Sequence, residues 1–245
     1  MDHRKDLSSR VLIAGGSSGM GEALARRMLQ EGAEVTIIGR SRERLWAARQ
    51  RLPCSERLRT YAADITREDE VAHLFDEIDQ LNHIACTAAD FEGAYEFLAD
   101  LKLTAVQRAV ESKILGPIML AKYGVPRLSR SGSITFTSGI AAYRPAARGT
   151  VVAAINAALE GLARALAIEL APIRVNVVSP GWVDTPIWRF VAGDAKDERL
   201  NAMATKLPVG RVGQPDDIAD AIRFLIGNGF TTGTVLHVEG GHRLV

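Results

Sequence analysis

Cysteine is scarce in this chain of 245 residues, which contains only Cys54 and Cys86. Two cysteines exclude a small scaffold held by several disulfides, and the five histidines are scattered without metal-ligand spacing, so we expect no metal site. An excess of one charge is also missing, because 30 Lys and Arg residues face 29 Asp and Glu residues. This balance argues against a nucleic-acid partner and against an acidic disordered chain.

Long uninterrupted apolar runs are absent as well. Polar and charged residues interrupt the most apolar stretch, residues 151–171, so we expect no membrane contact through it. The first ten residues are polar and charged, unlike a secretory signal. Together these features favour a cytoplasmic globular protein.

Short apolar runs alternate with longer amphipathic segments along the chain. The apolar runs predict strands at 10–14, 34–38, 60–63, 83–87, 133–137, 174–178 and 235–238. The longer segments predict helices at 22–31, 42–51, 68–80, 105–123, 151–170 and 216–226. A helix between successive strands requires parallel pairing, and strands this apolar need cover on both faces. The sequence therefore predicts an α/β fold, a doubly wound parallel sheet, in one domain spanning residues 1–245.

The least regular segment, residues 181–208, follows the sixth predicted strand. It contains four bulky apolar residues, which are Trp182, Ile187, Trp188 and Phe190. A long irregular segment after a strand is often a lid over a binding site. We therefore expect this segment to close over a small-molecule substrate with an apolar part.

A glycine-rich turn lies between the first predicted strand and the first predicted helix. Glycines let backbone N–H groups approach a pyrophosphate, and the helix N-terminus adds its positive dipole end. A turn that merely packs tightly is the alternative, but the strand–turn–helix context favours a dinucleotide site. The expected cofactor contacts in this turn are Gly15, Ser17, Ser18, Gly19, Met20 and Gly21.

The end of the second predicted strand bears on the choice of cofactor. An acidic residue there would bind the adenosine ribose and favour NAD(H), but the chain has Arg40 and Ser41 followed by Arg42. A guanidinium group can clamp a 2′-phosphate, so we expect NADP(H) to be favoured over NAD(H). The alternative is that these arginines are solvated residues at a helix start, which is the better interpretation for Arg42.

These motifs resemble the short-chain dehydrogenase/reductase family over nearly the whole chain. The family's TGxxxGxG turn is matched by residues 14–21, with Ala14 in place of Thr, and its IRVN and PGxVxTP segments by 173–176 and 180–186. Segments 208–215, 232–233 and 238–241 match the C-terminal part of the family. The resemblance implies a Rossmann-like fold, a nicotinamide cofactor and an oxidoreductase that acts on a small carbonyl or alcohol.

The resemblance also implies further cofactor contacts. Asp64, followed by Ile65, matches the family Asp that reaches the adenine ring. Thr87 and Ala88 stand where the family has its NNAG turn after the fourth strand. The remaining implied contacts, at the nicotinamide and phosphate end, are Pro180, Gly181, Val183, Thr185 and Asn156.

The resemblance fails at the catalytic YxxxK pair. Val152 falls at the Tyr position and Asn156 at the Lys position, and a shift of one residue gives Val151 and Ile155. Valine can neither donate nor accept a proton, whereas asparagine can still hydrogen-bond a nicotinamide ribose. Loss of general acid–base help reduces a rate by roughly 10²- to 10⁴-fold unless another group replaces it.

Three residues are candidates for the catalytic groups. Ser138 matches the family Ser and supplies a hydroxyl for a substrate carbonyl, with backbone capping as the alternative. Lys113 falls at the position of the family's catalytic Asn and would give a proton if desolvated, with a salt bridge to Glu111 or another carboxylate as the alternative. Tyr143 lies five residues after Ser138 and is either a substitute donor or a surface residue.

Two functions therefore stay open. One is an oxidoreductase with a rearranged acid, and the other is a catalytically inactive dinucleotide-binding protein, such as a cofactor sensor or a partner subunit. The Ala- and Leu-rich helix at 151–170 allows close helix packing, and the family often assembles through its long helices. We expect a homodimer or homotetramer.

Overall fold

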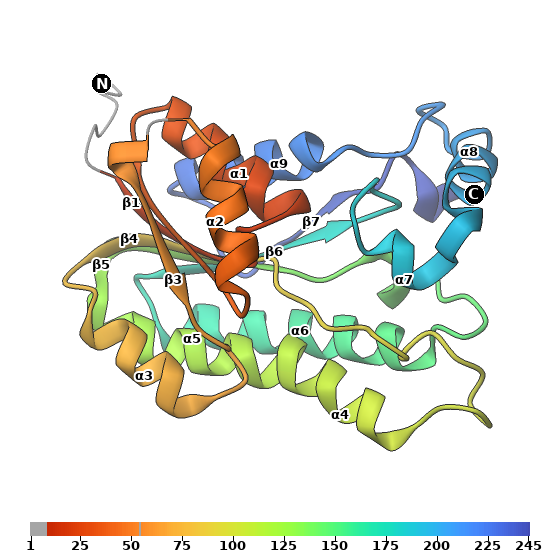
Figure 1. Ribbon diagram of the computed structural model, residues 1–245, viewed down its shortest axis with the longest axis horizontal. Helices are drawn as coiled ribbons and strands as arrows, with labels where there is room; N and C mark the ends of the chain where they lie inside the picture. Colours follow the sequence, from red (N-terminus) through yellow and green to blue (C-terminus); the bar gives the residue numbers. More distant parts are fainter. Residues whose placement is uncertain (1–8, 54) are drawn as a thin grey trace.

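The protein is described by a computed structural model that covers residues 9–53 and 55–245 (Figure 1). Seven parallel strands form one sheet in the order β3-β2-β1-β4-β5-β6-β7. The strands are β1 (Arg10–Ala14), β2 (Glu34–Gly39), β3 (Leu58–Ala62), β4 (Leu81–Cys86), β5 (Leu128–Thr137), β6 (Arg174–Pro180) and β7 (Val235–Val238). The strand order reverses direction between β1 and β4, which is where such sheets bind ligands. The predicted doubly wound parallel sheet is confirmed.

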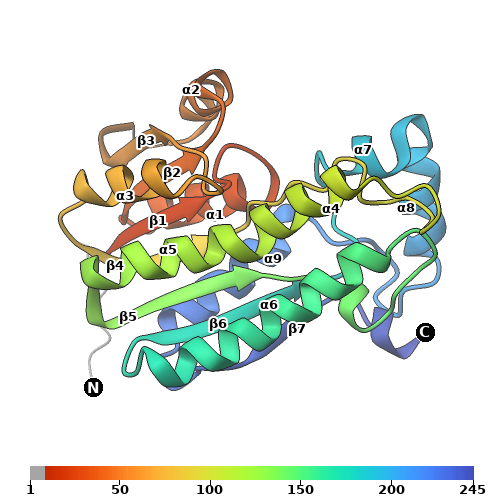
Figure 2. The ribbon, with the colours of Figure 1, turned by 90° about the horizontal axis from the view of Figure 1, so that it is seen from below.

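Helices cover both faces of the sheet, as Figures 1 and 2 show. One face carries α1 (Gly19–Gln30), α2 (Arg42–Arg51) and α9 (Pro215–Gly227), and the other carries α3 (Glu68–Asp76), α5 (Gly116–Gly124) and α6 (Thr150–Glu169). Leu24, Ile37 and Ile222 are buried in the first interface, and Phe75, Leu120 and Phe136 in the second. Burial on both faces explains why the strands are runs of Val, Ile and Leu rather than alternating sequences.

The helix predicted at 105–123 contains a wide turn. Helix α4 (Leu103–Val110) continues through the π-helical turn η2 (Glu111–Leu115) into α5. The N–H of Gly116 donates to the carbonyl of Glu111, five residues earlier. Pro117 has no N–H for the carbonyl of Lys113, and its ring crowds that carbonyl, so a regular α-helix cannot continue here.

Among the described residues, α6 is the one helix that passes a test for crossing a membrane by length and composition. In the structure it instead packs on the sheet, and Val152, Leu159 and Ala163 are buried. A core helix passes the same test, so the length and composition of α6 are explained by its packing on β5 and β6.

The prediction that residues 181–208 are irregular is wrong for most of that segment. It forms α7 (Trp188–Ala192), the 3₁₀ turn η5 (Gly193–Ala195) and α8 (Lys196–Ala204), beyond the carboxyl ends of the strands (Figure 1). The Nε1–H of Trp188 donates to the carbonyl of Val183 at 2.8 Å and fixes the start of α7. Acidic residues in the first turn of α8 complement the helix dipole. Helices this short leave little periodicity in the sequence.

Candidate functional site

The glycine-rich turn leaves no room for side chains. Gly15 has φ +85° and Gly19 has φ +55°, a left-handed backbone that favours glycine. A Cβ on Gly15 would lie 2.8 Å from the backbone nitrogen of Ala88, and one on Gly21 would collide with the carbonyl oxygen of Gly15. Ser18 precedes α1 without a side-chain cap, so the first N–H groups of α1 are available to an anion.

The residues directly after β4 pack against this glycine-rich turn. Thr87 donates to the carbonyl of Ala14 through its backbone N–H at 2.9 Å and through its hydroxyl at 3.1 Å. These bonds hold Thr87 and Ala88 against Gly15. The turn after β1 and the turn after β4 therefore pack together as one surface. Ser17, Ser18 and Met20, at or just before the start of α1, are half-buried or exposed on this surface.

The chain after β6 returns to the same turn. Pro180 ends β6, and Gly181 packs so closely on Glu239 that a Cβ would lie 2.7 Å from its Cα. Val183 and Thr185 are buried. A Cβ on Gly19 would be in van der Waals contact with Thr185, at 3.5 Å. The structure thus brings Thr185, at the end of this segment, to the start of α1.

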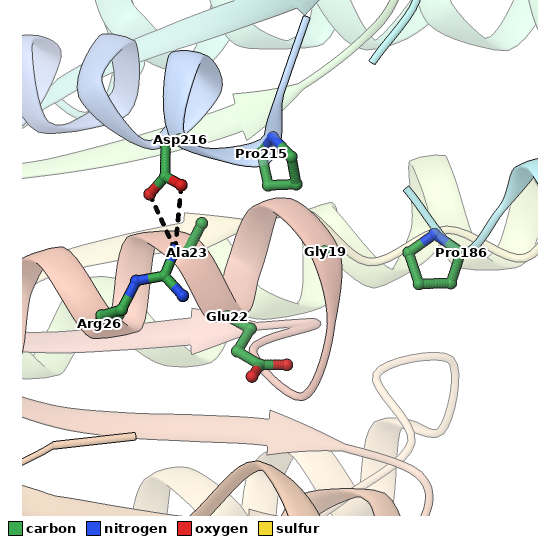
Figure 3. A pocket seen from close by; sticks show the side chains of 7 residues that line it. All are labelled: Gly19, Glu22, Ala23, Arg26, Pro186, Pro215 and Asp216. Atoms are coloured by element: carbon green, nitrogen blue, oxygen red, sulfur yellow. Dashed lines mark hydrogen bonds and ion pairs between the residues drawn. The ribbon is translucent and has the colours of Figure 1, made fainter. Parts of the chain in front are cut away.

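A pocket of about 260 Å³ lies beside this junction (Figure 3). Its walls are the first turns of α1, Pro186 and the start of α9. Arg26 donates to both carboxylate oxygens of Asp216, at 2.9 and 3.1 Å, and so links α1 to α9 across the pocket.

Four residues predicted to bind the cofactor follow the ends of β2 and β3, namely Arg40, Ser41, Asp64 and Ile65. Asp64 accepts hydrogen bonds from the backbone N–H and the hydroxyl of Thr66, which order the turn after β3. Ile65 is buried against Gly116 of α5. The hydroxyl of Ser41 accepts from the N–H of Arg44 at 3.1 Å and caps α2. The side chain of Arg40 is exposed and forms an ion pair with Asp90 at 2.9 Å.

Asn156 is buried on α6 beside the end of β5. Its side chain is 3% exposed, and its Nδ2 would lie 3.0 Å from a Cβ on Gly139. Its Oδ1 is buried without a hydrogen-bond partner among the described residues. A buried unpaired acceptor is costly unless a ligand donor meets it. Together with the glycine turn, Asn156 therefore fits a dinucleotide whose ribose hydroxyls donate.

Val152 lies one turn before Asn156 and belongs to an apolar cluster. The cluster joins Val152 and Ile155 to Ala109 of α4, with Phe91 and Tyr95 packed against it. No proton can be exchanged at this position of α6.

Lys113 points from the π turn to the end of β5. Its side chain is 3% exposed, and its Nζ donates to the carbonyl of Thr137, the residue before Ser138. Burial lowers the pKa of Lys113 to about 8, and the nearby thiol of Cys86 opposes that shift. Among the described residues it forms no ion pair with a carboxylate, so the interpretation as a salt bridge to Glu111 is not supported. The ring of Phe91 lies 5.8 Å from its Nζ.

Ser138 and Tyr143 share one carboxylate, that of Glu160. The Ser138 hydroxyl donates to Glu160 Oε1 at 2.9 Å, and the Tyr143 hydroxyl donates to Oε2. Burial, followed by the hydrogen bond to Glu160, raises the pKa of Tyr143 to about 12. The Tyr143 ring also stands edge-on to His237 of β7, with centroids 4.6 Å apart.

Sequence reasoning missed Glu160 and Asp90 as site residues. Glu160 lies four residues after Asn156, so helical periodicity could have placed both on the same face of α6. Asp90 follows an apolar strand end, but its contact with Arg40 joins residues 50 apart and leaves no local signal. Trp182 stacks at a tilt on Trp188, with centroids 4.6 Å apart. Of the four predicted apolar lid residues, the side chain of Phe190 lies outside the described part of the structure.

Comparison with known proteins extends these observations. Residues 14–243 match a family profile described as enoyl-(acyl carrier protein) reductase. The short-chain dehydrogenase/reductase ATR9 of Stachybotrys chlorohalonatus is 34% identical, over 94% of this chain and 95% of the relative. The short-chain dehydrogenase/reductase malC of Malbranchea aurantiaca is 33% identical, over 94% and 93%.

Solved structures give the same result. A small-chain dehydrogenase in complex with NADPH is 34% identical, with a TM-score of 0.84 over 97% of this chain and all of that one (100%). The MalC reductase/Diels-Alderase of Malbranchea aurantiaca is 31% identical, with a TM-score of 0.89 over 98% of each chain. The neighbour solved with NADPH supports binding of a nicotinamide dinucleotide. The matches span nearly the whole chain, and it therefore belongs to the short-chain dehydrogenase/reductase family of oxidoreductases, as its motifs predict.

Proposed function

We propose that this chain is an NADP(H)-dependent oxidoreductase of a small carbonyl or alcohol with an apolar part, in which Lys113 replaces the missing proton donor. The observation that carries this proposal is the place of Lys113, buried at the end of β5 beside Ser138, with its pKa lowered to about 8. A donor whose pKa lies near the working pH is the most effective acid–base catalyst. Tyr143 is less suited to this role, because its pKa is raised to about 12 and its proton is held by Glu160.

A bound nicotinamide would supply or accept the hydride, and residues of this chain would transfer the proton. Protonated Lys113 donates to the carbonyl oxygen of the substrate and neutralises the alkoxide as it forms. The proton of Ser138 is directed to Glu160, so the proton for the substrate oxygen comes from Lys113. In the oxidative direction, neutral Lys113 takes the hydroxyl proton of the alcohol.

In this proposal the cofactor binds on the turns after β1 and β4 and at the start of α1. The N–H groups at the start of α1 bind the pyrophosphate, and Asn156 Oδ1 accepts from the nicotinamide ribose. Arg40 binds the 2′-phosphate, which favours NADP(H) over NAD(H). Segment 181–208 serves as the lid of a single domain. We place the protein in the cytoplasm.

The experiment that tests this function measures NADPH oxidation by the purified protein against a panel of small ketones and aldehydes. Wild type is expected to turn over at least one apolar carbonyl, and Lys113→Met to lose that rate while still binding NADPH. Binding that raises the melting temperature without any turnover across the panel would instead favour the inactive dinucleotide-binding protein.

We propose a homodimer or homotetramer. Several large apolar side chains are exposed on the outer helices, namely Leu115 and Ile118 around the start of α5, Ile168 on α6 and Phe224 on α9. The exposed apolar positions of α5 and α6 lie on helices that cover the same face of the sheet, and they fit an interface between copies. Light scattering is expected to give a dimer or tetramer, and Ile118→Glu to shift it towards the monomer, whereas a wild-type monomer contradicts the proposal.

A further inference from the structure

One ion pair crosses over the glycine-rich turn. Arg40 Nη1 lies 2.9 Å from Asp90 Oδ2. Arg40 follows β2 and Asp90 follows β4, and β1 lies between these two strands in the sheet. The pair therefore spans the turn after β1, from one flank to the other, at the place where the proposed function requires the adenosine half of the cofactor.

Asp90 is the fixed member of this pair. Its side chain is 13% exposed, against 60% for Arg40. Its Oδ1 accepts from the N–H of Glu92 at 3.2 Å, and its own N–H donates to the hydroxyl of Ser112 at 2.9 Å. Ser112 is buried in the π turn beside Lys113. The carboxylate is thus held in place, while the long exposed arginine reaches over to it.

We propose that Asp90 is a specificity-determining residue, whose carboxylate competes with the 2′-phosphate of NADP(H) for Arg40. The carboxylate and the 2′-phosphate are both anions that a guanidinium group binds. Arg40 cannot form bidentate hydrogen bonds with both at the same time. The same carboxylate is an acceptor suited to the 2′-hydroxyl of NAD(H). Asp90, which follows β4, thereby supplies the acidic group that the end of β2 lacks. Its carboxylate reduces the preference for NADP(H) over NAD(H). This inference rests on the proposed function.

The test uses fragments of the cofactor, so it needs no catalytic activity. Calorimetry gives the Kd of adenosine 2′,5′-bisphosphate and of 5′-AMP for wild type, Asp90→Asn, Arg40→Ala and the double variant. The amide introduced by Asp90→Asn keeps an oxygen for the N–H of Glu92, so the turn is retained. Removing the competing charge is expected to raise the preference for the bisphosphate over 5′-AMP about two- to fivefold, the range of an exposed ion pair.

The controls separate the two proposals. Asp76→Asn removes a carboxylate whose ion pair with Arg127 lies at the C-terminal end of α3, beside the amino end of β5, and it is expected to leave the preference unchanged. In the Arg40→Ala background, Asp90→Asn is expected to raise the preference less than in wild type, because only the contact of Asp90 with the 2′-hydroxyl is then weakened. An unchanged preference in Asp90→Asn, with Arg40→Ala still weakening the bisphosphate, overturns the role of Asp90 alone. If Arg40→Ala has no effect either, the arginine clamp of the proposed function fails. Asp90→Ser, which retains an acceptor for Glu92, repeats the test if Asp90→Asn does not fold.

Discussion

Lys113 donates a hydrogen bond to the carbonyl of Thr137, the residue that leads directly into Ser138. This contact joins the π turn of the long α4–α5 helix to the end of β5. Pro117, four residues after Lys113, prevents a regular helix at this point and so sets where the lysine emerges. A lysine therefore lies close to the serine of the family motif in a chain whose α6 has no tyrosine or lysine to act as donor.

The first prediction concerns the pH dependence of reduction. A lysine with a pKa of about 8 is protonated below that pH and neutral above it. The rate of NADPH oxidation is expected to be constant at lower pH and to fall about tenfold per pH unit above about 8. Stopped-flow single turnovers measure this profile. Lys113→Arg, whose side chain does not titrate in this range, is expected to remove the descending limb, and a profile that survives this variant contradicts the assignment.

The same lysine affects stability. Its pKa falls from 10.5 in the unfolded chain to about 8 in the folded protein, so the unfolded state binds more protons between these values. The free energy of unfolding is therefore expected to rise with pH from about 8 to 10.5. Urea unfolding across this range measures it, and Lys113→Met is expected to lack this component of the rise. An identical pH dependence in both proteins would refute the burial of a titrating lysine.

Tyr143 is expected to be dispensable for proton transfer. In Tyr143→Phe the rate should stay within about fivefold of wild type, far less than the roughly 10²- to 10⁴-fold loss of a true donor. In Glu160→Gln, loss of the carboxylate charge is expected to lower the pKa of Tyr143 from about 12 towards its ordinary value, seen by ultraviolet titration. A Tyr143→Phe variant as inactive as Lys113→Met would transfer the role of donor to the tyrosine.

The glycine turn allows a matched pair of substitutions. Gly21→Ala puts a Cβ against the carbonyl of Gly15, whereas Gly161→Ala on α6 meets only the end of Arg164, at 3.9 Å. We expect Gly21→Ala to abolish the rise in melting temperature caused by NADPH. Gly161→Ala should retain that rise and gain up to about 1 kcal/mol of stability from helix propensity. Equal NADPH binding by both variants would remove the turn from the cofactor site.

The sequence was informative wherever local signals decide the structure. Helix α2 begins and ends as predicted, because Ser41 caps its first turn and a proline follows its end. The glycine turn and the segment after β6 lie together, since Gly19 is next to Thr185. By contrast, the short helices α7 and α8 have too few turns to show periodicity, and the sequence predicts irregular chain there.

The contacts that define the chemistry were not predictable. The bonds of Glu160 to Ser138 and Tyr143 join the end of β5 to the middle of α6, and the pair of Arg40 and Asp90 joins two strand ends. Such pairings depend on how the elements pack rather than on neighbouring residues. The position of Lys113 was suggested by the family motif. Its contact with Thr137 follows from the π turn, which Pro117 favours but does not specify alone.

The most direct test of the account compares wild type with Lys113→Met in a single turnover of NADPH with the carbonyl that wild type reduces fastest. NADPH affinity, measured by fluorescence titration, is expected to be the same in both proteins, and the rate of hydride transfer to fall by at least about 10²-fold in the variant. A Lys113→Met protein that binds NADPH and reduces the carbonyl at the wild-type rate would contradict the central role of Lys113.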